Sequence, residues 1–72
     1  MLDYNKLREL RKINGWTYAQ LAQHLAREQR TFCSPQRLSA YEKGRTKNCP
    51  PHTLLSLAKL YGVEPEELLV NV

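Results

Sequence analysis

An arginine in an unfavourable position is the first residue of this sequence that suggests chemistry. Ser34 and Pro35 mark the start of a short helix, and Arg37 follows three residues after Ser34. The positive end of the helix dipole makes a cation unfavourable there by about 0.3–1 kcal/mol. A capping box would place Glu or Gln at this position. We therefore expect a negative group from outside the chain to lie against the start of this helix.

Two cysteines and two histidines are the other residues whose side chains suggest chemistry, in this case metal binding. His24, Cys33, Cys49 and His52 are the ligand types of a structural zinc site, and Cys49 and His52 have a plausible local spacing. His24, however, falls in the middle of a predicted helix without a ligand partner nearby. We expect no metal, no cofactor and reduced cysteines. Because no arrangement of nucleophile, base and acid stands out, we expect no catalytic residues and no enzyme.

Length and charge indicate one small basic domain. The chain has 72 residues and a formal charge of +4, and we expect a single domain over 1–72 with one small core. Positive charge gathers in residues 27–47, whereas residues 48–72 are acidic. A basic patch is typical of nucleic-acid binders, although a solvated surface can show the same clustering. No apolar run approaches the ~18 residues of a membrane span, and no signal peptide is visible. We therefore expect a soluble, cytoplasmic protein with no membrane partner.

The apolar residues recur at helical spacing and predict an all-α fold. Helices are expected at residues 3–14, 18–30, 35–43, 51–61 and 65–70, which together form a compact five-helix domain. The glycines follow the apolar stripes and the prolines precede them, as is typical of helix ends and helix starts.

The second and third predicted helices begin differently. Thr17 and Gln20 form a capping box, and Trp16 and Leu21 have the spacing of its hydrophobic staple. The third helix has a cap, Ser34, without the reciprocal partner. The second helix is thus built for stability at its start, and the third is not.

A capped helix, a connection and a short helix with small polar residues are the parts of a helix-turn-helix. The chain resembles the phage-repressor and Xre class (Cro and cI-like) of helix-turn-helix DNA-binding domains over about residues 4–69. The matching residues are Leu7-Arg8-x-x-Arg11, Gly15-Trp16-Thr17, Ala19-x-Leu21-Ala22, Ser34-x-x-x-Leu38-Ser39-x-Tyr41-Glu42-x-Gly44, and then Pro50, Leu54, Leu57, Ala58, Tyr61, Gly62, Val63 and Leu68.

The sequence departs from that family in the connection at residues 26–33, which is about six residues longer than the common pattern. We expect the second helix to continue past Leu25, residues 31–33 to form a loop, and Phe32 to pack onto the core. Arg27 and Arg30 can reach a phosphate backbone or simply keep a longer helix soluble.

The resemblance implies that the helix at 35–43 enters the DNA major groove with its first residues against base edges. An arginine can bind guanine O6 and N7 bidentately, which would explain the unfavourable cation. The residues expected at base edges are Pro35, Gln36, Arg37, Ser39 and Ala40. Those expected at phosphates are Thr17, Tyr18, Gln20, Arg27, Arg30, Ser34, Lys43, Arg45, Lys47 and Asn48. Arg37 can also be an ordinary surface arginine, the loop residues can be merely solvated, and Tyr18 can belong to the core.

The resemblance further implies an ion pair with a structural role. The family often pairs an arginine of the first helix with a glutamate near the end of the third, and Arg11 and Glu42 are the matching positions. We expect this pair to be partly buried and to have no role in DNA contact.

The expected function is sequence-specific binding of double-stranded DNA by a transcriptional regulator of bacterial or phage type, associated with the nucleoid. We expect a repressor, although the sequence itself does not distinguish repression from activation. A homodimer can form through the apolar C-terminal residues Leu68, Leu69, Val70 and Val72, although the leucines can instead complete the core. The alternative is a protein-interaction module, an antitoxin or adaptor of the same fold without operator binding.

Overall fold

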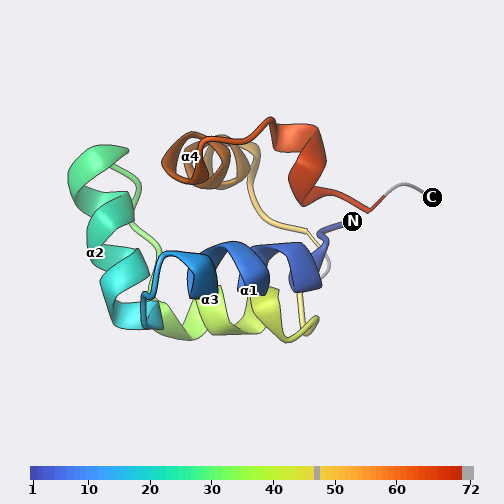
Figure 1. The fold of residues 1–72 in the computed structure, drawn as a ribbon, viewed down its shortest axis with the longest axis horizontal. Coiled ribbons are helices and arrows are strands. Elements are labelled where there is room, and N and C mark those ends of the chain that lie inside the picture. The colour runs from blue at the N-terminus through green and yellow to red at the C-terminus, as the bar shows by residue number, and fades with distance from the viewer. Residues whose placement is uncertain (47, 71–72) are drawn as a thin grey trace.

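The structure consists of short helices joined by tight connections. The computed structural model describes residues 1–46 and 48–70, so the predictions for Lys47 and Val72 lie outside the described residues. Figure 1 shows the chain in these ranges, where the fold is all-α as predicted. The elements are α1 (Tyr4–Ile13), α2 (Tyr18–Glu28), α3 (Pro35–Glu42), α4 (Pro51–Tyr61) and the 3-10 helix η1 (Pro65–Leu68).

The structure corrects the fifth predicted helix, at residues 65–70. Only a four-residue 3-10 helix forms there, and the chain then runs extended beside the N-terminus. The Asp3 N–H donates to the Leu68 carbonyl at 2.9 Å, and the Val70 N–H donates to the Met1 carbonyl at 2.9 Å. These bonds satisfy backbone groups that a longer helix would have paired internally.

The helices are arranged so that α2 joins two sides of the molecule. In Figure 1, α1 lies beside α3, the beginning of α2 lies next to α3, and the end of α2 lies next to α4. η1 packs on α4 and α1, at the far end of the molecule from α2. Of the helices the structure describes, none is both long and apolar enough to cross a membrane.

One leucine-rich core holds these elements together. Its largest fully buried side chains come from α2, α3, α4 and η1, and fully burying each one contributes about 1.5–3 kcal/mol. Thr31, in the connection between α2 and α3, is buried and its hydroxyl forms a hydrogen bond with the hydroxyl of Ser56 in α4. The leucines are Leu21, Leu25, Leu38, Leu57 and Leu68.

The end of α2 differs from the ends of the other three α-helices. The glycine after α3, Gly44, has φ 74° and lies so close to Tyr4 that an added Cβ would meet its ring at 3.4 Å. After α2, which ends two residues earlier than predicted, the left-handed position is occupied by Arg30, with φ 52°. A residue with a side chain is less stable in this conformation by about 1–2 kcal/mol.

Candidate nucleic-acid interface

The start of α3 has the capped form that the sequence predicts. The Ser34 hydroxyl accepts the backbone N–H of Arg37 at 3.2 Å, and Pro35 occupies the first turn. The helix buries Leu38, Tyr41 and Glu42, which lie on one face at spacings of three and four residues, against the core. Its outer side therefore carries the polar residues predicted to face DNA: Gln36, Arg37 and Lys43 are exposed, and Ser39 and Ala40 are half-buried.

Residues from α2, α3 and the following loop meet in one open cleft. It has a volume of about 340 Å³ and is lined by Tyr18, Pro35, Gln36, Ser39 and Arg45. The backbone N–H of Arg45 donates to the Ala40 carbonyl at 3.0 Å, which fixes the turn after α3. The cleft thus combines an amide, two hydroxyls and a guanidinium, which are groups that bind base edges and phosphates.

An ion pair on the inner side of α3 connects this cleft to α1. Arg11 Nε donates to both carboxylate oxygens of Glu42 at 3.0 Å, and the two side chains are only 13% and 3% exposed. Arg11 Nη1 also donates to the carbonyl of Trp16 at 2.8 Å. The same guanidinium lies 4.3 Å from the centre of the Tyr18 ring, a cation–π contact. Arg11 therefore positions the start of α2 and the end of α3 relative to each other, and the expected pair is present.

Arg37 and Gln36 lie on different flanks of α3. Neighbouring helical residues are separated by about 100°, and Arg37 does not line the cleft that contains Gln36. Arg37 lies on the side of α3 nearer to Cys33. Burial raises the pKa of the Cys33 thiol, and the positive charge of Arg37 is close enough to oppose part of that rise. Within residues 1–46 and 48–70, the guanidinium of Arg37 makes no hydrogen bond or ion pair, and it is free to accept an external partner.

The exposed charges of residues 34–46 are all positive. Arg37, Lys43 and Arg45 are exposed, whereas Glu42, the only acidic residue of this segment, is buried against Arg11. The exposed acidic residues of η1 lie at the opposite side of the molecule (Figure 1). Such a separation of charge favours an anionic partner at α3.

The residues predicted to contact phosphates fall into two groups. Thr17 and Gln20 form the predicted reciprocal capping box at the start of α2: the Thr17 N–H donates to Gln20 Oε1 at 2.9 Å, and the Gln20 N–H donates to Thr17 Oγ1 at 3.1 Å. They lie at the same end of α2 as the cleft, and Asn48 is exposed in the loop before α4. Arg27 is exposed about 13 Å further along the axis of α2 than Tyr18, and Arg30 is exposed just past the end of that helix.

The connection before α3 contradicts one prediction. Phe32 does not pack onto the core. The residue is 85% exposed. Thr31 and Cys33 point inward instead. An extended backbone sends alternate side chains to opposite sides, so two inward neighbours direct Phe32 to solvent.

The cysteines and histidines do not assemble into a metal site. No group of three potential ligands comes together among the residues that the structure describes. Cys33 and Cys49 are free, and burial raises the pKa of both thiols, which keeps them protonated near neutral pH. His24 is stacked on Trp16, with ring centroids 4.3 Å apart, and its Nδ1 lies 2.7 Å from a carboxylate oxygen of Glu28.

Comparisons with known proteins agree with this geometry. A search of curated proteins and a search of solved structures each returned no significant match. A family model described as a helix-turn-helix domain matches residues 5–69, nearly the whole chain. The capped α2, the connection and the outward-facing α3 lie within that match. The chain therefore belongs to this helix-turn-helix domain family, which is of the Xre/Cro-like type.

Proposed function

We propose that this protein is a sequence-specific regulator that binds double-stranded DNA with α3 in the major groove. The observation that carries this proposal is the first turn of α3, where Gln36 and Arg37 are exposed in a segment whose exposed charges are all positive. A helix that leaves a cation unpaired at its positive end has a place for an anionic partner. The family match supports DNA as that partner.

The side chains of α3 suit particular base edges. Arg37 is placed to bind guanine O6 and N7, and the Gln36 amide to bind adenine N6 and N7. Ala40 offers a methyl group to thymine, while Ser39 and Pro35 border the cleft beside Gln36. Because Gln36 and Arg37 occupy different flanks, the two residues would read different base pairs.

The phosphate contacts of the proposed complex surround this helix. Arg45 and Lys43 follow α3, and the first turn of α2 presents backbone N–H groups beside the same cleft. Gln20 uses its oxygen in the capping box, which leaves its NH₂ group to donate to a phosphate. Ser34, Thr17, Tyr18, Lys47 and Asn48 complete the proposed set. We leave Arg27 and Arg30 out of this set because they lie at the other end of α2, and their contact with phosphates stays a prediction.

We propose repression as the outcome of binding, since occupation of an operator blocks access to the DNA without any further domain. Two copies on half-sites about one helical turn apart would match the symmetry common to this class of motif. Both points rest on the family type. Selection of bound sequences from a random pool of DNA duplexes, followed by affinity measurements, tests them together: a palindromic consensus supports a two-fold dimer, and a single half-site contradicts it.

The first variant for this selection is Arg37→Ala. Loss of a bidentate contact to guanine should relax the base preference at one position and lower the affinity for the selected site by about 1–3 kcal/mol. Circular dichroism serves as the control for folding. An unchanged consensus from the variant would contradict the assigned role of Arg37.

The matched variant is Arg45→Ala. Because Arg45 is proposed to contact a phosphate, its loss should weaken binding to all sequences alike and flatten the log–log dependence of affinity on salt by about one unit. A protein-interaction module, such as an antitoxin or adaptor of this fold, would show no salt-dependent affinity for mixed duplex DNA at all. That result would overturn the proposed function.

A further inference from the structure

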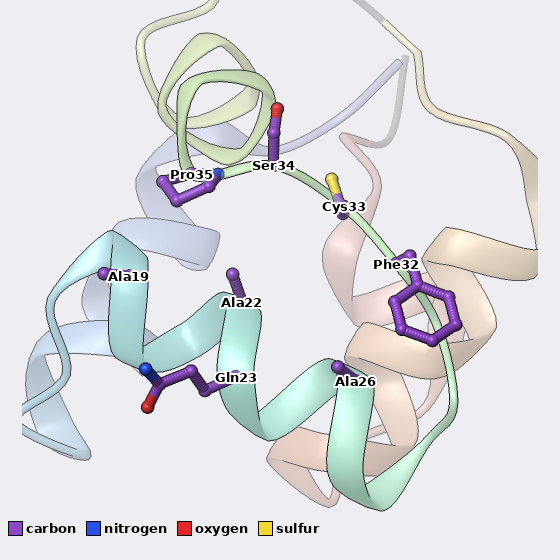
Figure 2. A pocket seen from close by; sticks show the side chains of 8 residues that line it. All are labelled: Ala19, Ala22, Gln23, Ala26, Phe32, Cys33, Ser34 and Pro35. Carbon is purple, nitrogen blue, oxygen red and sulfur yellow. The ribbon is translucent and has the colours of Figure 1, made fainter.

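An open groove runs along the outer side of α2 and meets the cleft at the start of α3, where Pro35 lines both. We call it the α2 groove; Figure 2 shows it between α2 and the connection that follows. Its volume is about 550 Å³, and it extends to the first residues of α3. The residues that line it are Ala19, Ala22, Gln23 and Ala26 of α2, Phe32 and Cys33 of the connection, and Ser34 and Pro35 at the start of α3.

Phe32 is the feature of this groove that calls for an explanation. Its ring lies beside Ala26 (Figure 2) and is 85% exposed, more than any other large apolar side chain among the described residues. The backbone fixes this orientation, because Thr31 is held inward by Ser56 and by a 3.1 Å bond from its N–H to the Leu25 carbonyl. Exposed aromatic rings next to concave apolar surface are typical of protein-binding sites.

Two arginines lie close in the sequence to Ala26 and Phe32 of the α2 groove. Arg27 directly follows Ala26 in α2, Arg30 precedes Phe32 by two residues, and both arginines are exposed. The nearest acidic residue in the sequence, Glu28, is bonded to His24, about half a turn of the helix away from the alanines that line the groove. An arginine pair beside an aromatic ring is a combination enriched at interface hot spots.

We propose that the α2 groove binds a partner protein through an acidic segment that carries an apolar side chain. The apolar side chain would lie between Phe32 and Ala26, and the carboxylates would pair with Arg27 and Arg30. A DNA backbone fits the part of this surface beside Phe32 poorly, since Ala22, Ala26 and Phe32 offer no side-chain donors to phosphates. Ser34 and Pro35 belong both to this groove and to the proposed DNA interface, so the apolar side chain is assigned to the other end of the groove, beside Phe32 and Ala26.

A selection from a library of random 12-residue peptides on the full chain tests this proposal, and it requires no DNA. Peptides enriched in Asp or Glu together with Leu, Ile or Phe are expected, and their affinity can be measured by fluorescence anisotropy. Phe32→Ala and the double variant Arg27→Ala, Arg30→Ala should each weaken binding at least tenfold. Lys12→Ala, which removes an exposed cation from α1, is the matched control and should leave the affinity unchanged.

Three results would overturn the proposal. One is a set of selected peptides without acidic residues, or peptides whose binding is insensitive to Phe32→Ala in a folded variant. Another is a reduced salt dependence of DNA binding in the double arginine variant with unchanged peptide affinity, which would assign Arg27 and Arg30 to phosphates. The third is concentration-dependent self-association in sedimentation that Phe32→Ala abolishes, which would make a second copy of the chain the occupant. Failure of DNA binding itself would leave the peptide result standing.

Discussion

α2 and α3 form one helix pair but are held in the molecule in different ways. α2 buries two leucines, Leu21 and Leu25, and starts with two reciprocal capping bonds. α3 buries Leu38 and Tyr41 together with a charged residue, Glu42, and starts with a single capping bond. Apolar burial has no preferred direction, whereas a hydrogen-bonded ion pair does.

This difference separates stability from orientation. α2 is held mainly by the burial of Leu21 and Leu25, and its start by the contact of Tyr18 with Arg11. α3 is fixed in one rotation, because Glu42 is bonded through two oxygens to Arg11, and Arg11 is in turn held by the carbonyl of Trp16. The rotation of α3 determines which residues face outward, so the inner ion pair sets the position of Gln36 and Arg37.

The largest effect is expected from breaking the inner pair of α3. Glu42→Ala leaves the Arg11 guanidinium without its partner and should reduce the free energy of unfolding by about 3–5 kcal/mol. A domain of 72 residues has only about 4–11 kcal/mol in total. Urea unfolding followed by circular dichroism measures the loss, and Leu25→Ala in α2 is the matched apolar deletion, at about 2–5 kcal/mol.

Replacing both charged partners sharpens the comparison. In Arg11→Met, Glu42→Leu no charge is left unpaired, so this variant should be much more stable than Glu42→Ala. If the pair orients α3, the double variant should nevertheless show a weaker or altered base preference. A double variant with the base preference of the wild type would contradict the role of the Arg11–Glu42 pair in orienting α3. The difference between α2 and α3 would then be only in how much apolar surface each buries.

The parts of the fold that the sequence predicts correctly are determined locally. The capping box at Thr17 and the cap at Ser34 depend on residues within one helical turn, and the helix periods depend on neighbouring turns. The last helix was predicted wrongly because its outcome depends on a distant segment: the N-terminal residues pair with Leu69.

The same reasoning explains what the sequence could and could not predict about the site. The exposure of Gln36, Arg37 and Lys43 follows from the helical period of α3. The place of Arg45 beside Gln36 depends on the turn after α3, and the outward position of Phe32 depends on the contact between Thr31 and Ser56. The burial of Thr31 and Cys33 on either side of Phe32 could not be recognised from the sequence alone.

A smaller effect is expected from removing the caps. Thr17→Ala should reduce the free energy of unfolding by about 1 kcal/mol and Ser34→Ala by about 0.5 kcal/mol, because only the first cap is part of a reciprocal box. Thermal and urea unfolding of the two variants give the difference. Equal losses, or a larger one for Ser34→Ala, would show that the start of α3 is as strongly stabilised as that of α2.

The smallest change in stability is expected from Arg37→Glu, and its sign is the informative part. A glutamate at this position removes an unfavourable cation from the positive end of α3 and completes a capping box with Ser34. The variant should therefore be more stable than the wild type by about 0.3–1 kcal/mol. Its affinity for the selected DNA should fall at least tenfold, since a carboxylate replaces the group proposed to bind guanine.

Arg45→Glu provides the matched control for this reversal of charge. Arg45 follows the C-terminal end of α3, where the helix dipole favours a cation, so its replacement should lower both DNA affinity and stability. Opposite changes in stability for the two variants, with the same loss of DNA binding, would show that the chain retains Arg37 for its partner at the expense of its own fold. A loss of stability in Arg37→Glu would instead mean that Arg37 stabilises the free protein, and its exposure at the start of α3 would no longer point to DNA.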